Sequence, residues 1–114
     1  MGSVTTPSRR LCSRVDASED VWVYWSCGGR DDVSRVRNLS FGGLFVETVD
    51  TRPVGLKATI DFLVQEGQIR ADAVVRHATT PTGLGLRFVA VKEHDRPNLA
   101  ALVRRLRSPR KNAL

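Results

Sequence analysis

The fold of this chain is decided by the stretch Leu56-Lys57-Ala58-Thr59-Ile60-Asp61-Phe62-Leu63-Val64, in which apolar and polar side chains alternate. Leu63 alone breaks the alternation. A period of two is typical of a β-strand with one buried and one solvated face, because successive side chains point to opposite sides. After Gln65-Glu66-Gly67 the alternation resumes, with the odd-numbered positions from Ile69 to Val75 apolar. The two stretches therefore predict an antiparallel hairpin with one wet face.

Short strands are predicted on both sides of this hairpin. Towards the N-terminus lie the β-branched and aromatic run 21–25, a second short strand over 33–37 and a third over 44–48. Residues 38–43 between the last two are expected to form a loop. In the run 21–25, Trp22 and Tyr24 alternate with three other apolar residues, so either set can face outward. Towards the C-terminus, the turn 79–83 is followed by a half-buried strand over 84–88.

The C-terminal segment carries a helical pattern instead. One apolar stripe follows the spacing i, i+3, i+4, i+7 and consists of Leu99, Leu102, Val103 and Leu106. Asp95 can cap this helix. The pattern predicts a mainly β fold, a small six-stranded antiparallel barrel closed by a C-terminal α-helix. We expect residues 1–14 to be a flexible tail and residues 15–110 to form a single domain.

Composition narrows the class of protein. The 114 residues carry 18 Lys and Arg against 12 Asp and Glu, a formal net charge of +6, which favours an anionic partner. No apolar run is long enough to cross a bilayer, and the N-terminal stretch lacks the apolar region of a secretory signal. Cys12 and Cys27 are too few for a disulfide framework. We expect a cytoplasmic protein without a membrane span.

Catalytic chemistry has little support in the sequence. The acidic residues are scattered, and His77 and His94 have no partner at metal-ligand spacing. Cys12 stands among arginines but has no evident base to activate it. We therefore expect neither an enzyme nor a bound cofactor or metal, with both histidines as ordinary surface residues.

Two short patterns remain, and their order is informative. The first is Arg10-x-x-x-Arg14, and the second is Asn38-x-Ser40-x-x-Gly43 at a junction between strands. Asn and Ser supply small hydrogen-bonding groups, and Gly lets a ligand approach the backbone closely. The alternative is a plain turn in which Asn38 and Ser40 bond their own backbone.

Taken together, these patterns resemble the PilZ domain, the bacterial receptor for cyclic di-GMP. The family signature is R-x-x-x-R followed by [D/N]-x-S-x-x-G, and the resemblance extends to a late glycine-containing strand at 83–88. It implies a six-stranded barrel with a C-terminal helix. It also implies a ligand site formed by Arg10, Arg14, Asn38, Ser40 and Gly43. One departure is Asn38, where many members carry Asp.

Further arginines bear on the same expected site. In the resembling family, an arginine at the position of Arg9 accompanies two intercalated cyclic di-GMP molecules, so we expect two ligands per chain. Arg76 is outward-facing and late in its strand, and it either flanks the ligand or is a solvated charge. Arginine suits such a ligand because it can fork onto phosphate oxygens, pair with guanine and stack on a purine.

The resemblance implies a function and leaves alternatives. We expect a stand-alone cyclic di-GMP receptor that changes conformation on binding, as the tail folds over the nucleotide, and signals through an effector protein. One alternative is an interaction adaptor of the same fold that does not bind nucleotide. Another is a small basic barrel that binds single-stranded nucleic acid through outward aromatic residues.

Overall fold

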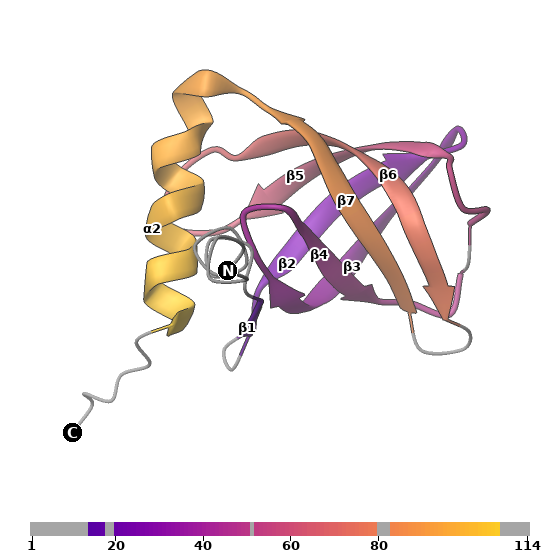
Figure 1. Cartoon of the computed structure of the whole chain (residues 1–114), viewed down its shortest axis with the longest axis horizontal. Coiled ribbons are helices and arrows are strands. Elements are labelled where there is room, and N and C mark those ends of the chain that lie inside the picture. Colours follow the sequence, from indigo (N-terminus) through magenta and orange to yellow (C-terminus); the bar gives the residue numbers. More distant parts are fainter. Residues whose placement is uncertain (1–13, 18–19, 51, 80–82, 108–114) are drawn as a thin grey trace, which may run out of the picture.

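A computed structural model describes residues 14–17, 20–50, 52–79 and 83–107. Its strands are β1 (Val15–Asp16), β2 (Trp22–Cys27), β3 (Arg30–Leu39), β4 (Gly43–Glu47), β5 (Lys57–Leu63), β6 (Arg70–Thr79) and β7 (Gly83–Val91). A 3-10 turn, η2 (Glu93–Asp95), leads into the helix α2 (Arg96–Arg107). The helix stands across one end of the strands (Figure 1).

The strands close into the expected barrel. Neighbouring strands follow the order β3-β2-β5-β6-β7-β4, all pairs are antiparallel, and β4 pairs back onto β3. The short strand β1 is an additional strand that pairs with the end of β3, where Val15 lies opposite Leu39 and Asp16 opposite Asn38. A six-stranded antiparallel barrel with a C-terminal helix is therefore confirmed.

The run 21–25 shows which side chains fill the barrel. Val21, Val23 and Trp25 are fully buried, whereas Trp22 and Tyr24 are 41% and 39% exposed. The set that faces inward is fixed by the position of β2 between β3 and β5. The inward side chains of β2 meet inward apolar residues of the neighbouring strands, such as Ile60. Trp22 and Tyr24 are consequently the outward set of the two that the sequence left open.

The apolar stripe of the helix is buried as expected. Leu99, Leu102, Val103 and Leu106 all belong to the core, each with at most 4% of its surface exposed. Asp95 directly precedes the helix, is itself buried, and accepts the backbone N–H of Arg70 at 2.9 Å. The start of α2 is thereby tied to β6.

Several boundaries differ from the sequence-based expectation. The predicted strands 21–25, 44–48 and 84–88 are shifted or extended by one to three residues. The largest differences lie in β3 and in the loop that follows it. The predicted strand over 33–37 is in fact β3, with ten residues, and it includes Asn38 and Leu39. The predicted loop over 38–43 shrinks to Ser40–Gly42, because Asn38 pairs with Phe45 and Leu39 with Leu44 in a tight hairpin. Polar and glycine residues indicated a loop, but pairing with β4 satisfies their backbone groups within the sheet.

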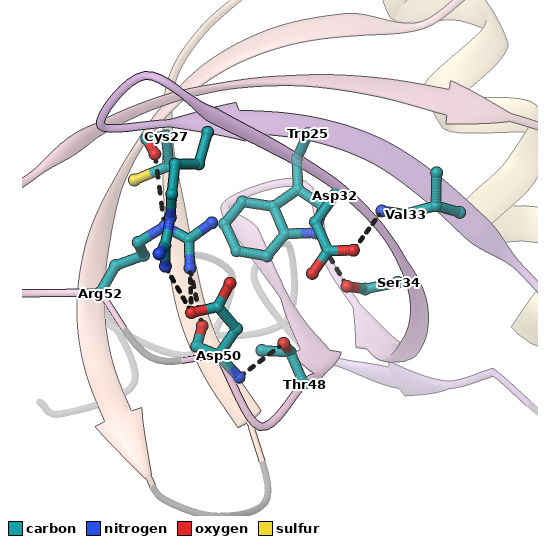
Figure 2. Close-up of polar contacts among 9 residues, drawn as sticks. Trp25, Cys27, Asp32, Val33, Ser34, Thr48, Asp50 and Arg52 are labelled. Atoms are coloured by element: carbon teal, nitrogen blue, oxygen red, sulfur yellow. Dashed lines mark hydrogen bonds and ion pairs between the residues drawn. The ribbon is translucent and has the colours of Figure 1, made fainter.

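A buried arginine lies at the end of the barrel away from α2 (Figure 2). The guanidinium of Arg52 stacks over the ring of Trp25, with 4.8 Å between Cζ and the ring centroid. Its Nε donates to the carbonyl of Cys27 at 3.3 Å, and its Nη1 lies 2.9 Å from the carboxylate of Asp50. Arg52 therefore closes this end with stacking, hydrogen-bond and ionic contacts together.

Candidate functional site

The two sequence patterns meet in the structure: Arg14 ends the first pattern, Asn38 begins the second, and the two residues are in contact. Arg14 immediately precedes β1, and β1 pairs with the end of β3. This pairing brings Arg14 beside Asn38, whose Oδ1 accepts a hydrogen bond from Nη1 of Arg14 at 2.7 Å. The acceptor is a neutral amide, so this hydrogen bond does not offset the charge of the guanidinium and leaves its other N–H donors available.

Ser40 is used by its own loop. Its side chain is buried, its Oγ accepts the backbone N–H of Gly42 at 3.0 Å, and its own N–H donates to the carbonyl of Gly43 at 2.9 Å. This is the turn-type bonding that the sequence left open as an alternative for Ser40. Asn38 differs, because its side-chain oxygen accepts from Arg14.

Gly43 has a structural requirement of its own. It is buried in β4 opposite Arg87, and a Cβ placed on it would stand 2.2 Å from the carbonyl oxygen of Leu86. Its φ is not in the left-handed region, which among the described glycines is occupied by Gly28, Gly29, Gly55 and Gly67. The close approach at Gly43 is thus to the neighbouring strand β7.

Two β-bulges present polar residues near this loop. In β3, the register shifts between Val36 and Asn38, which leaves Arg37 as the extra residue. In β6, the register shifts between Val75 and His77, which leaves Arg76 as the extra residue. A bulge turns two consecutive side chains towards the same side, which a regular strand does not do. Both Arg76 and His77 are accordingly exposed on the outer face.

These elements surround one pocket of about 230 Å³. Its lining comes from the start of β1, the Ser40 loop, the β6 bulge and β7: Arg14, Ser40, Gly42, Arg76, His77, Gly85, Leu86 and Arg87. Arg76, for which the sequence left open a position beside the ligand or a solvated charge, is in this lining. Arg87 lies in the strand 83–88 to which the family resemblance extends, but the sequence did not predict it as a site residue. His77 was expected as an ordinary surface residue, because a lone histidine carries no motif. Trp22 is outside it.

The charge of the pocket is not compensated locally. Arg14, Arg76 and Arg87 form no ion pair with any carboxylate in the described part of the chain. By contrast, ion pairs do hold six other arginines: Arg30, Arg35, Arg37, Arg52, Arg70 and Arg105. Three unpaired guanidiniums at one small, solvent-open pocket suit an anionic ligand that takes several charge-assisted hydrogen bonds.

Other classes of site find no support among the described residues. No three His, Cys, Asp or Glu side chains in these ranges gather as metal ligands would. Burial raises the pKa of the Cys27 thiol, which works against a reactive thiolate. None of the described helices has the length and apolarity to span a bilayer. Arg9, Arg10 and Cys12 lie outside the described residues.

Comparison with known proteins identifies close structural counterparts. A family model for the PilZ domain matches residues 8–105. The fold is similar to the PilZ domain, solved with c-di-GMP, of YcgR from Escherichia coli, with a TM-score of 0.69, 19% identity and 87% and 92% coverage of the two chains. A search of curated proteins gives no match.

Two further solved structures share the fold. The inhibitor of motility MotI/DgrA of Bacillus subtilis matches with a TM-score of 0.71 and 23% identity, over 90% of this chain and 53% of the other. The PilZ domain of CeSA from a cellulose-synthesizing bacterium matches with a TM-score of 0.65 and 15% identity, over 83% and 98% of the two chains.

Proposed function

Because the chain belongs to the PilZ domain family, we propose that it is a receptor for cyclic di-GMP that binds at the pocket between the Ser40 loop, β6 and β7. The observation that carries this proposal is the meeting of the two signature elements, where Arg14 donates to Asn38 at the edge of a pocket with three unpaired arginines. The YcgR domain of the same fold was solved with this nucleotide.

The chemistry of the ligand fits these groups. Cyclic di-GMP has two phosphates, which guanidinium groups can bind in a forked geometry, and two guanines, which present O6 and N7 acceptors and a stacking face. Asn38 can offer its amide N–H to the nucleotide while its oxygen holds Arg14. Ser40 would act by fixing the loop whose backbone, at Gly42, lines the pocket, while Gly43 allows β4 to lie close to β7.

The N-terminal segment would complete the receptor. We take residues 15–110 as the receptor domain and residues 1–14 as the segment that folds over the nucleotide and brings Arg9 and Arg10 to it. Three arginines in this segment would offset the repulsion among the four phosphates of two stacked ligands, so we propose two ligands per chain. The rearranged segment would then be visible to an effector protein.

Isothermal titration calorimetry with cyclic di-GMP, and with cyclic di-AMP as the control ligand, tests the proposal. Loss of a charge-assisted contact costs about 1.5–3 kcal/mol, so we expect Arg10→Ala and Arg14→Ala to weaken binding by about ten- to a hundredfold. Arg30→Ala is the matched control, because Arg30 begins the strand that ends near Asn38 and is exposed. Unchanged affinity in the Arg10→Ala/Arg14→Ala double variant would contradict the site.

A calorimetric count tests the stoichiometry separately. We expect two ligands per unmutated chain, and Arg9→Leu should shift this number towards one. A count of one in the unmutated protein would refute the paired-ligand proposal while leaving the receptor proposal intact.

Binding of single-stranded nucleic acid is the competing function, and the electrostatics of the outer face disfavour it. Trp22 and Tyr24 do face outward, as base stacking would need. However, the Tyr24 hydroxyl donates to the carboxylate of Asp31, and Tyr24 pairs across the strands with Asp61. The hydrogen bond raises the pKa of Tyr24 and lowers the pKa of Asp31, so Asp31 stays charged and repels phosphate. A steep fall of affinity with salt would favour nucleic acid instead.

A further inference from the structure

The helix α2 has one covered flank and one open flank. On the covered flank, Asn98 donates to the carbonyl of Gln68 at 2.9 Å, and Arg105 forms an ion pair with Glu66. Both partners belong to the β5–β6 connection. On the open flank, Arg96, Arg104 and Arg107 are exposed, and none has an ion-pair partner among the residues that the structure describes.

A groove of about 660 Å³ runs beside the open flank. Apolar groups from the Ser40 loop, β7 and α2 form most of its lining: Phe41, Phe88, Val89, Ala90, Val91, Pro97, Leu99 and Ala100. Phe41 is 42% exposed and Val89 is 62% exposed, the latter as the extra residue of a bulge in β7. The charged groups of the lining are Glu93 and Arg96. Large apolar side chains left this open often mark an interaction site.

The helical spacing places the free arginines along this groove. Ala100 lines the groove, Arg96 and Arg104 lie one turn before and after it, and Arg107 lies two turns after it. Side chains at these spacings share a face of a helix. The groove therefore has an apolar floor and a row of cations along one side, with Glu93 as the single opposing charge of its lining.

We propose that this groove docks an acidic segment of a partner protein that inserts apolar side chains between β7 and α2. Charge complementarity selects the occupant, because carboxylates of the segment would pair with Arg96, Arg104 and Arg107 while its apolar side chains cover Phe41 and Val89. A basic segment would meet the same row of arginines and be repelled.

The groove also has a direct connection to the nucleotide pocket. Phe41 lines the groove, and its chain neighbours Ser40 and Gly42 line the pocket. A ligand that moves this three-residue loop would move a side chain of the docking surface. In this respect the inference rests on the proposed receptor function and identifies the surface through which the signal would leave. By linkage, nucleotide and partner segment would each change the affinity of the other by the same factor.

The test is a selection of random peptides of about twelve residues, displayed on phage, against the full chain. We expect the selected peptides to combine Asp or Glu with aromatic or aliphatic residues. Their synthesised forms should bind the Val89→Asp/Arg96→Glu variant about tenfold more weakly than the unmutated chain. Arg96→Glu lies in the first turn of α2, where a carboxylate favours the helix.

The matched control is Val54→Asp/Lys57→Glu, which makes the same change in charge at exposed positions that do not line the groove. This control should bind the peptides as the unmutated chain does. Basic or purely polar peptides, no enrichment, or equal binding to both double variants would overturn the proposal. An affinity that does not change when cyclic di-GMP is added would overturn the link through Phe41.

Failure of the receptor proposal is distinguishable from failure of this one. Calorimetry with cyclic di-GMP on the groove variant should give the affinity of the unmutated chain, since neither Val89 nor Arg96 lines the nucleotide pocket. If the unmutated chain does not bind cyclic di-GMP, the receptor proposal fails while the peptide selection still decides the groove.

Discussion

Gly43 illustrates how a single residue of a ligand signature can also be required by the fold. Its missing side chain allows β4 to pass within van der Waals distance of β7, where a Cβ would meet the carbonyl oxygen of Leu86 at 2.2 Å. Loss of ligand binding in a Gly43 variant would therefore not by itself show a direct contact. Stability has to be measured beside affinity.

Gly43→Ala is expected to destabilise the barrel by about 3 kcal/mol, because the overlap involves backbone atoms that cannot rotate away. Gly85→Ala is the graded control, since the added Cβ would meet the exposed His77 side chain at 3.3 Å and that side chain can shift. Chemical denaturation compares the two. Equal stability of both variants would contradict the close β4–β7 contact.

Arg52 is a second residue with a structural role. It is 5% exposed, and its Nη2 has no hydrogen-bond partner although it is buried. Arg52→Ala removes the stacking on Trp25 and opens a cavity, so we expect a loss of about 1–3 kcal/mol in unfolding free energy. Arg52→Met keeps much of the volume and removes the unsatisfied donor, so it should cost less.

Urea denaturation of both Arg52 variants, followed by the fluorescence of the chain's tryptophans, measures these differences. An Arg52→Met variant that is as unstable as Arg52→Ala would show that the ionic contacts of Arg52, and not its packing, hold this end of the barrel.

At the scale of elements, α2 depends on its apolar stripe. Leu102 is fully buried between the helix and the barrel. Leu102→Ala should cost about 2–5 kcal/mol, and Leu102→Asp should unfold the domain or release the helix. Arg104→Ala, an exposed change in the same helix, is the control for helix propensity. An unaltered circular dichroism spectrum and melting curve in Leu102→Asp would contradict the docked helix.

The covered flank of α2 should be sensitive to acid. The hydrogen bond from Arg105 lowers the pKa of Glu66, whose side chain is 9% exposed. A carboxyl group with a lowered pKa in the folded state stabilises that state above its unfolded pKa, and this contribution is lost as the pH falls through the folded pKa. Glu66→Gln should therefore cost about 1–2 kcal/mol at pH 7 and almost nothing once the pH has fallen below the lowered pKa of Glu66 in the folded state.

Unfolding free energies of the unmutated chain and Glu66→Gln, measured at several pH values, check this expectation. The control is Asp32→Asn, which changes a carboxylate outside the α2 contact. A difference between the unmutated chain and Glu66→Gln that does not shrink as the pH falls through the acidic range would refute the assigned ion pair.

At the scale of the whole molecule, a ligand that binds the folded state raises its melting temperature. At a free concentration about a hundred times Kd, the stabilisation is about 2.7 kcal/mol, which for a chain of this size corresponds to a rise of roughly 10 °C. Cyclic di-GMP should produce this rise in the unmutated chain, and cyclic di-AMP should not. Scanning calorimetry that finds the same rise in Arg14→Ala would exclude Arg14 from the site.

The sequence by itself determined the elements of this fold. The alternation over 56–64, the odd-numbered apolar positions of β6 and the stripe on α2 were all readable, because each is a local pattern set by which neighbours must be buried. The resemblance carried by Arg10, Arg14, Asn38, Ser40 and Gly43 indicated the family, and the family model matches residues 8–105. The barrel with its helix was predicted from the local patterns and, independently, from the resemblance.

Tertiary structure alone decided which residues meet. Register and bulges brought Arg76, His77 and Arg87 to the pocket beside Arg14, and pairing with β4 drew Asn38 into a strand. The tertiary structure also places Trp22 on the outer face and leaves the groove beside α2, which Phe41 lines, open to solvent. These outcomes depend on contacts between segments far apart in the chain. A shift of one residue in register reverses the face that every side chain occupies, and closure of the barrel fixes that register.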